Sequence, residues 1–218
     1  MLSRCCCALA LTCVLVLPLQ AQTVRFDTNV GTIDLDLNPT GTPDLQAHVD
    51  NMLDYVEAGL YDRLVLNRAD DSGTDDRTPG NDFVLQMGRF RTNGLNVPSS
   101  QAGFIDNRDF QFAPITVDAD GDGSVDFDRS ALSNTKGEVS LALAGGDPNS
   151  GTSEFFFNLG DNSFLDGQGF VPFGRVRDFA TLDLIFTLDN QSIFPGTFYN
   201  TPLLDDGRLV FVERAYVL

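Results

Sequence analysis

Histidine and cysteine are scarce in this chain of 218 residues, and their scarcity excludes much enzyme chemistry. The one histidine, His48, lies among apolar residues of an expected helix, where a structural role is favoured, and all four cysteines fall within the first 13 residues. Zinc centres and Ser-His-Asp or Cys-His catalysis therefore lack the side chains that they need. No glycine-rich phosphate loop stands between an expected strand and a helix. The reaction, if there is one, must need none of these groups.

Lysine and glutamate are also rare, so the charge of this chain comes mostly from aspartate. There is one lysine, there are 27 aspartates against four glutamates, and the formal net charge is −17. Aspartate favours turns whereas glutamate favours helices, so this bias is typical of a loop-rich β-protein. An acidic surface repels phosphate groups. We therefore expect neither a nucleic acid nor an anionic membrane as a partner.

Long apolar runs are missing except near the N-terminus, which is typical of a secretory signal peptide. Arg4 supplies a positive start, Ala8–Leu17 an apolar stretch and Leu19–Ala21 a small-residue cleavage site. The run is too short to span a membrane. A lipoprotein signal is disfavoured, because the residues before Cys13 do not match the sequence that precedes a lipidated cysteine. We therefore expect residues 1–21 to be removed. Residues 22–218 should fold as one exported domain, periplasmic or secreted, without thiols and without membrane insertion.

Short alternating segments dominate the rest of the chain. Val24–Leu37 alternates apolar and polar residues around a turn, which predicts a hairpin. An apolar stripe over Leu45–Val56 predicts a helix that stops at Gly59, and a second helix is expected near Phe179–Leu188. Further strands are expected at Leu64–Leu66, Phe83–Met87, Val139–Ala142, Phe155–Leu159, Val171–Val176 and Leu209–Tyr216. Many strands with two helices favour a closed barrel that is capped at its ends.

Three consecutive phenylalanines, Phe155, Phe156 and Phe157, carry more aromatic surface than one face of a strand needs. Side chains alternate along a strand, so Phe156 must point away from the face that its two neighbours share. We expect Phe155 and Phe157 in the core. Phe156 should then line a binding surface or lie under a cover.

Several motifs occur together in an order that resembles the cyclophilin-type peptidyl-prolyl cis-trans isomerases. The first half contributes the Val24–Leu37 hairpin, a helix from Thr42–Pro43 to Tyr61–Asp62, Leu66–Arg68, and Phe83–Gly88. The second half contributes Ser140–Ala142, Gly151–Phe156, Phe164–Asp166, Phe173–Gly174 and Asn200–Leu203. This resemblance covers nearly the whole chain after the signal segment, and an ordered set of motifs is far more specific than any one of them.

The resemblance implies a mainly β fold, a closed eight-stranded antiparallel β-barrel capped by two α-helices, and an enzyme that isomerises X-Pro bonds. Its clients would be unfolded or flexible proline-containing polypeptides, and it would act as a monomer with no required cofactor. Catalytic roles are implied for Arg68, Phe83 and Gln86. Substrate-binding roles are implied for Val84, Ala142, Leu143, Glu154, Phe156, Phe164, Leu165 and Phe170.

Prolyl isomerisation suits a chain with so few reactive groups, because it breaks no covalent bond. The enzyme only has to lower a rotational barrier of roughly 20 kcal/mol that comes from amide resonance. An apolar cup would grip the proline ring, and the rigid, permanently charged guanidinium of Arg68 would favour the twisted amide. Gln86 would either hold the substrate backbone or orient Arg68. By resemblance, the cup consists of Phe83, Val84, Phe156 and Leu165, with Phe164 and Phe170 at its rim.

Four positions depart from the family pattern. Asn67 stands where the family usually has histidine, Leu143 where it has a backbone-binding asparagine, and Glu154 where it has glutamine; Phe164 replaces a frequent tryptophan. The changes at Asn67, Leu143 and Glu154 leave open a second function, a proline-peptide-binding or chaperone module with weak or no turnover.

Ala69–Asp82 is an insert-like segment of 14 residues where the family has a short turn. Arg77 within it is a rival to Arg68 for the catalytic position. We favour Arg68 because it follows an expected strand in a Leu-Asn-Arg context.

An acidic loop resembles the first half of an EF-hand calcium loop. Its oxygen-bearing residues alternate, Gly123 permits the sharp turn, and the twelfth position is Arg129 rather than glutamate. The alternatives are a structural calcium site and a solvated acidic turn. A calcium-dependent adhesive domain is a third candidate function, and it rests on this loop alone. The candidate ligands are Asp118, Asp120, Asp122, Ser124 and Asp126.

Overall fold

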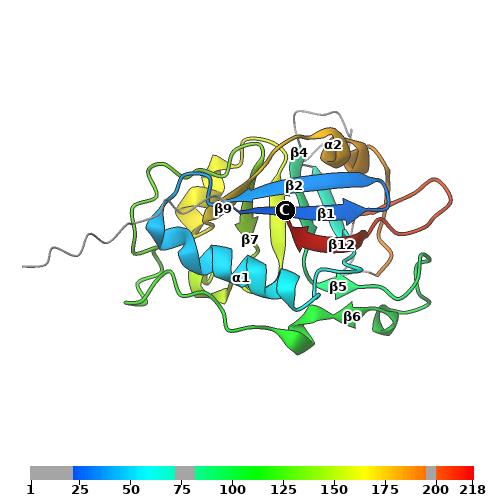
Figure 1. Cartoon of the computed structure of the whole chain (residues 1–218), viewed down its shortest axis with the longest axis horizontal. Coiled ribbons are helices and arrows are strands. Elements are labelled where there is room, and N and C mark those ends of the chain that lie inside the picture. Colours follow the sequence, from blue (N-terminus) through cyan, green and yellow to red (C-terminus); the bar gives the residue numbers. More distant parts are fainter. Residues whose placement is uncertain (1–21, 72–81, 195–199) are drawn as a thin grey trace, which may run out of the picture.

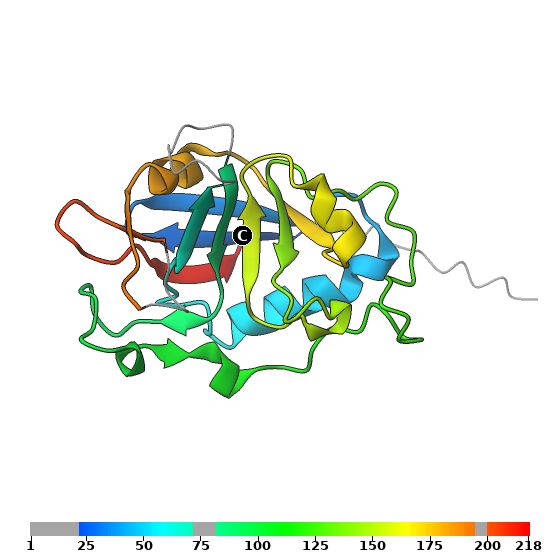
Figure 2. The ribbon, with the colours of Figure 1, turned by 180° about the vertical axis from the view of Figure 1, so that it is seen from behind.

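The computed structural model describes residues 22–71, 82–194 and 200–218, and the expected signal segment and Arg77 lie outside these ranges. One antiparallel sheet of eight strands organises the fold (Figures 1 and 2), in the order β12-β1-β2-β9-β7-β8-β4-β3. In that order the strands are Val212–Val217, Thr23–Thr28, Gly31–Leu37, Pro172–Val176, Glu138–Leu141, Phe155–Asn158, Asp82–Met87 and Arg68–Asp71. The expected eight antiparallel strands are therefore confirmed.

Smaller elements surround this sheet. Two short antiparallel pairs are β5 (Phe90–Arg91) with β6 (Ile105–Asp106), and β10 (Asp189–Gln191) with β11 (Thr201–Leu203). The α-helices are α1 (Gln46–Glu57) and α2 (Ala180–Phe186), which lie toward opposite ends of the curled sheet in Figure 1, α1 at the lower left and α2 at the upper right. The 3-10 turns are η1 (Pro43–Leu45), η2 (Gln101–Gly103), η3 (Asn107–Phe110), η4 (Pro148–Ser150) and η5 (Ser163–Gln168). No helix in the described ranges is long and apolar enough to cross a membrane.

The sheet is curled but open, so the closed barrel expected from the sequence is wrong in that respect. Within the described residues, β12 and β3 form the two edges and no ladder joins them. The expected strand Leu64–Leu66 does not form, because its residues bridge different partners. Leu64 pairs with Arg91, whereas Val65 pairs with Phe211 beside β12. Two isolated bridges cannot replace the continuous ladder that closure requires.

The core lies on the concave side of the sheet and receives the apolar stripe of α1. Val49, Met52 and Val56 are buried there, as the helical periodicity predicted. The helix ends at Glu57, and Gly59 follows with a φ of 65°, a left-handed conformation that glycine adopts without a Cβ clash. The predicted second helix is confirmed with shorter bounds, as α2.

His48 is buried in this core with 4% of its surface exposed. Its ring stacks on that of Phe173 at 5.6 Å between centroids, and its Nδ1 has no hydrogen-bond partner. Burial disfavours the charged ring and lowers the pKa of His48 from 6.5 to about 4. The structural role predicted for this histidine agrees with these contacts.

The pKa of His48 predicts an acid-sensitive fold. The unfolded chain binds the proton more tightly than the folded chain, so the free energy of unfolding is highest above about pH 6.5 and falls as the pH drops toward 4. The histidine should contribute about 3 kcal/mol to this loss. Urea unfolding between pH 7 and pH 4.5 would measure it, with His48→Leu as the control. Carboxylates titrate in both proteins, so identical pH slopes in the two would contradict the assignment.

Candidate active site

Strand register gathers one row of side chains on the face of the sheet that turns away from the core. Directly opposed residues in neighbouring strands share a face. Ala69, Leu85 and Phe157 belong to the main core, so the residues that alternate with them point to the other face. Across β3, β4, β8 and β7 the register of this outer row is Arg68, Gln86, Phe156 and Ser140.

A cavity of about 270 Å³ opens over this row. Ten of the eleven residues that the sequence assigned to catalysis or substrate binding line it. They are Arg68, Phe83, Val84, Gln86, Ala142, Leu143, Glu154, Phe156, Leu165 and Phe170. The eleventh, Phe164, is 59% exposed and stacks on Phe83 with 5.9 Å between the ring centroids. The structure therefore brings the whole set together.

Phe83 reaches this cavity because of an irregularity in the strand pairing. Asp70 pairs with Val84 and Asp71 pairs with Asp82, so Phe83 has no partner in β3. Strict alternation would send the side chains of Phe83 and Val84 to opposite faces, whereas both line the cavity. Bulges of this kind re-aim side chains and are frequent beside active sites.

The apolar wall of the cavity is a small cluster separate from the main core. Its buried members are Val84, Phe156 and Leu165, of which the last lies on η5. Phe170 packs on Phe156 edge to face, with 5.7 Å between the ring centroids. Phe156 is thus segregated from Phe155 and Phe157, as the alternation predicted. The cluster forms an aromatic cup that is open on one side.

The polar side of the cavity is built around Arg68. Its Nη1 donates to Oε1 of Gln86 at 3.3 Å, and its guanidinium carbon lies 5.8 Å from the centroid of the Phe83 ring. Asp70 accepts from Nε at 3.1 Å and also from Nη2. Of the two roles considered for Gln86, the orientation of Arg68 is the one with a contact in this structure. A fixed cation therefore faces an apolar cup.

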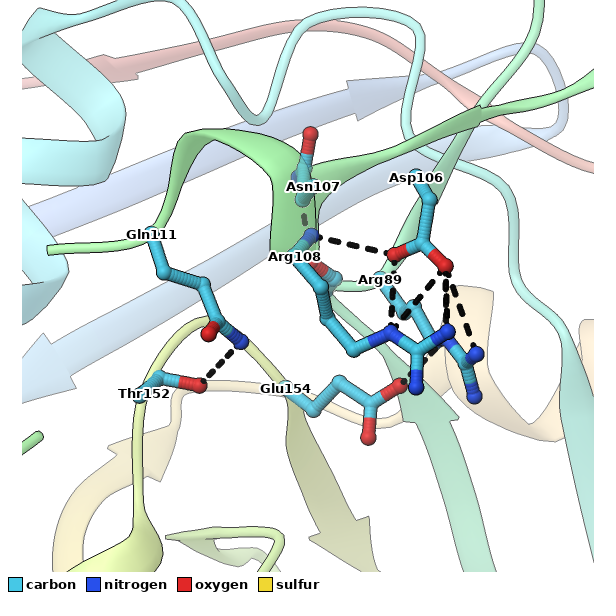
Figure 3. Close-up of polar contacts among 8 residues, drawn as sticks. Arg89, Asp106, Asn107, Arg108, Gln111, Thr152 and Glu154 are labelled. Atoms are coloured by element: carbon cyan, nitrogen blue, oxygen red, sulfur yellow. Dashed lines mark hydrogen bonds and ion pairs between the residues drawn. The ribbon is translucent and has the colours of Figure 1, made fainter.

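Glu154 lies on the wall between this cavity and a second one of about 540 Å³. Its Oε1 is 3.7 Å from Nε of Arg89, on the side where Arg89 and Arg108 also meet Asp106 (Figure 3). Burial raises the pKa of Glu154, and the two arginines oppose that rise. Unlike glutamine, an ionised glutamate has no N–H to donate. In that state Glu154 can only accept hydrogen bonds from a ligand.

Two more of the four departures from the family pattern, Leu143 and Asn67, have different surroundings. Leu143 lines both cavities, and its side chain has no polar atom to bind a backbone. Asn67 is buried, does not line the cavity, and is held by its backbone, with its N–H donating to Gln86 O at 3.2 Å. The insert-like segment is shorter than expected, because Ala69–Asp71 and Asp82 belong to β3 and β4.

Asn134 braces the segment that forms the apolar wall, and no pattern in the sequence points to this role. The side chain is fully buried; its oxygen accepts from Ser140 Oγ at 2.7 Å and from Asn158 Nδ2 at 3.2 Å. Its amide nitrogen donates to Asp166 Oδ1 at 2.7 Å and to Phe170 O at 3.1 Å. The residue thereby joins β7 and β8 to the segment that carries the apolar wall. Its side-chain partners come from distant parts of the chain.

The acidic loop brings three of its four candidate aspartates together. Carboxylate oxygens of Asp118, Asp120 and Asp126 lie within 4.8 Å of one another. Asp122 is outside this group, and its Oδ1 accepts the N–H of Ser124 at 2.8 Å. Backbone N–H groups of the loop also bind the Asp118 carboxylate. Calcium binding stays a prediction, and an unchanged melting temperature with added calcium would count against it.

Comparisons with known proteins agree with this geometry. The family model described as cyclophilin type peptidyl-prolyl cis-trans isomerase/CLD matches residues 23–211. The chain belongs to this family, and it is accordingly a peptidyl-prolyl cis-trans isomerase by class.

Two relatives and one solved structure indicate how far the likeness extends. Peptidyl-prolyl cis-trans isomerase cyp18 of Streptomyces antibioticus is 31% identical over 164 residues, 72% of this chain and 78% of the relative. Peptidyl-prolyl cis-trans isomerase A of Dickeya dadantii is 28% identical over 184 residues, 82% of this chain and 77% of the relative. A cyclophilin type isomerase of Cryptosporidium parvum, crystallised in the presence of the dipeptide Ala-Pro, shares the fold. Its TM-score is 0.57 at 19% identity, with 90% of this chain and 99% of that chain covered.

Proposed function

We propose that this protein isomerises X-Pro bonds in unfolded or flexible polypeptides, with the cavity over β4 and β8 as its active site. The observation that carries the proposal is the position of Arg68 on the same sheet face as the aromatic cup, within one cavity of about 270 Å³. A proline-containing ligand is supported by the fold relative that was crystallised with Ala-Pro.

The proposed mechanism assigns separate tasks to the two sides of the cavity. Phe156, Val84 and Leu165 bury the proline ring, because the transfer of an apolar ring out of water is favourable. Arg68 then donates to the amide as it twists, when the nitrogen becomes pyramidal and more basic. A donor already fixed by the protein stabilises that state without reorganising. Gln86 holds the guanidinium toward the cavity.

Export is a second part of the proposal, and it is supported by the first 21 residues of the sequence. Their charged start, apolar stretch and small-residue end have the order of a signal peptide. Mass spectrometry of the secreted or periplasmic protein should give a chain that begins at Gln22. An intact N-terminus in the cytoplasm would contradict this part alone.

A peptide-binding module without turnover is the competing function, since Leu143 and Glu154 both change groups that line the cavity. A protease-coupled assay on an X-Pro peptide separates the two, together with a calorimetric titration of the same peptide. Turnover above the uncatalysed rate supports the enzyme. Binding without acceleration would assign the cavity to a chaperone-like role, and the absence of both would overturn the site.

A further inference from the structure

We propose that Asp70 is a positioning residue for Arg68, an inference that rests on the proposed function. Its carboxylate holds one edge of the guanidinium so that the opposite nitrogen, Nη1, faces Gln86 and the cavity. The sequence motifs and the family resemblance assigned no role to this residue.

The geometry of β3 makes this contact a consequence of the strand itself. Arg68 and Asp70 are two residues apart in one strand, so their side chains share a face. Across the strand pair, Arg68 is opposite Gln86 and Asp70 is opposite Val84, both of which line the cavity. The carboxylate therefore stands beside the guanidinium on the cavity face rather than on the core face.

Asp70 is in turn held from the other side. Its Oδ1 accepts from Nδ2 of Asn200 at 3.3 Å, while its Oδ2 accepts from Arg68. Asn200 is fixed to the same strand, because its carbonyl oxygen accepts the N–H of Ala69 at 2.8 Å. The two oxygens of one carboxylate thus join the guanidinium to a neighbouring segment.

The burial of the pair makes a positioning role effective. The side chains of Arg68 and Asp70 are 23% and 22% exposed, so water competes for this contact less than it does for a surface ion pair. A free arginine side chain has about 2 kcal/mol of rotamer entropy to lose on being fixed. When the protein has already fixed it, less of that cost falls on the transition state. The carboxylate also offsets part of the positive charge of Arg68. Positioning should therefore raise kcat, whereas the partial loss of charge should lower it.

Asp70→Ala and Asp70→Asn separate these two effects. The asparagine keeps an oxygen that can accept from the guanidinium but removes the negative charge. Under the positioning role, kcat of Asp70→Ala falls about 10-fold or more with little change in KM, because misplacing a catalytic group slows the chemical step. Asp70→Asn should keep most of the wild-type kcat. A kcat for Asp70→Ala equal to or above wild type would overturn the proposal.

Asp36→Ala is the matched control. Asp36 lies on β2, does not line the cavity, and accepts from Nε of Arg177 at 2.9 Å, so its removal also breaks an aspartate–arginine pair. Its kcat should stay at the wild-type value. An equal loss of kcat in Asp36→Ala and Asp70→Ala would assign the effect to general destabilisation.

A spectroscopic measurement keeps this inference distinct from the proposed function. The Nε–H of Arg68 in the peptide-free protein should give an NMR signal protected from solvent exchange, because it donates to Asp70. Asp70→Ala should remove that protection, and Asp36→Ala should leave it unchanged. If wild type proves inactive while this pattern holds, the proposed function fails and the positioning stands. If the protection is the same in Asp70→Ala, the positioning fails whatever the activity.

Discussion

Arg68→Ala should lower turnover on an X-Pro peptide by roughly 10²-fold or more, which is the usual effect of removing a preorganised donor at a transition state. The side chain is the cation of the cavity row, and its Nη1 is directed to Gln86 at the cavity wall. It belongs to neither apolar cluster, so we expect the variant to stay folded. The ratio kcat/KM, measured beside a urea unfolding curve, checks both halves of this expectation.

Two further variants make the assignment of Arg68 specific. Arg68→Lys should recover little activity, because a point charge cannot reproduce the planar fork of the guanidinium. Arg77→Ala should remain close to wild type, since the sequence context favours Arg68 for the catalytic position; Arg77 lies outside the described residues. The reverse ranking of the two alanine variants would mean that the catalytic strand begins near Arg77, and that Leu66–Arg68 had been wrongly aligned.

The site was predictable from the sequence to the extent that it depends on strand periodicity and on the order of motifs. Alternation alone separates Phe156 from its two neighbours, and the structure confirms that separation. The position of Phe83 follows a different cause. It depends on a one-residue shift in pairing between β3 and β4, and no local pattern in the sequence reports a register shift.

Long-range polar contacts were equally unpredictable from the sequence. Asn134 meets Asp166 and Ser140 only after β7 and the turn beyond β8 have packed, so its importance is a property of tertiary structure. The openness of the sheet has the same origin. Leu64 and Val65 are apolar, as the residues of a buried strand usually are, yet each forms a bridge with a different partner. Local propensity does not decide such a competition.

Glu154 shows how a single departure from the family pattern changes the chemistry of one position at the cavity wall. Its carboxylate is directed to the arginines of the second cavity, and its burial raises its pKa. A ligand that donates hydrogen bonds is favoured at this wall over one that accepts them while the group is ionised. Glu154→Gln should therefore change substrate preference most for the part of the peptide that lies over this wall.

The second large effect concerns the three consecutive phenylalanines of β8. Phe155→Ala and Phe157→Ala should each lower the free energy of unfolding by about 3–5 kcal/mol, because each leaves a cavity in a close-packed core. Both rings are fully buried, and Phe155 lies 5.7 Å from Phe26 and 5.4 Å from Tyr61 between ring centroids. Neither ring lines the active-site cavity, so peptide affinity should change little wherever the variants remain folded.

Phe156→Ala should show the opposite pattern, although this ring is also only 4% exposed. Its neighbours are Val84, Leu165 and Phe170, which belong to the cup, and the space left by truncation would join a cavity that is already open. The loss of unfolding free energy should therefore be the smallest of the three, whereas peptide binding should weaken most. Urea unfolding and calorimetric titration of all three variants with one X-Pro peptide make the comparison. The largest destabilisation at Phe156, with unchanged peptide affinity, would reverse the two faces of β8 and remove the cup from the site.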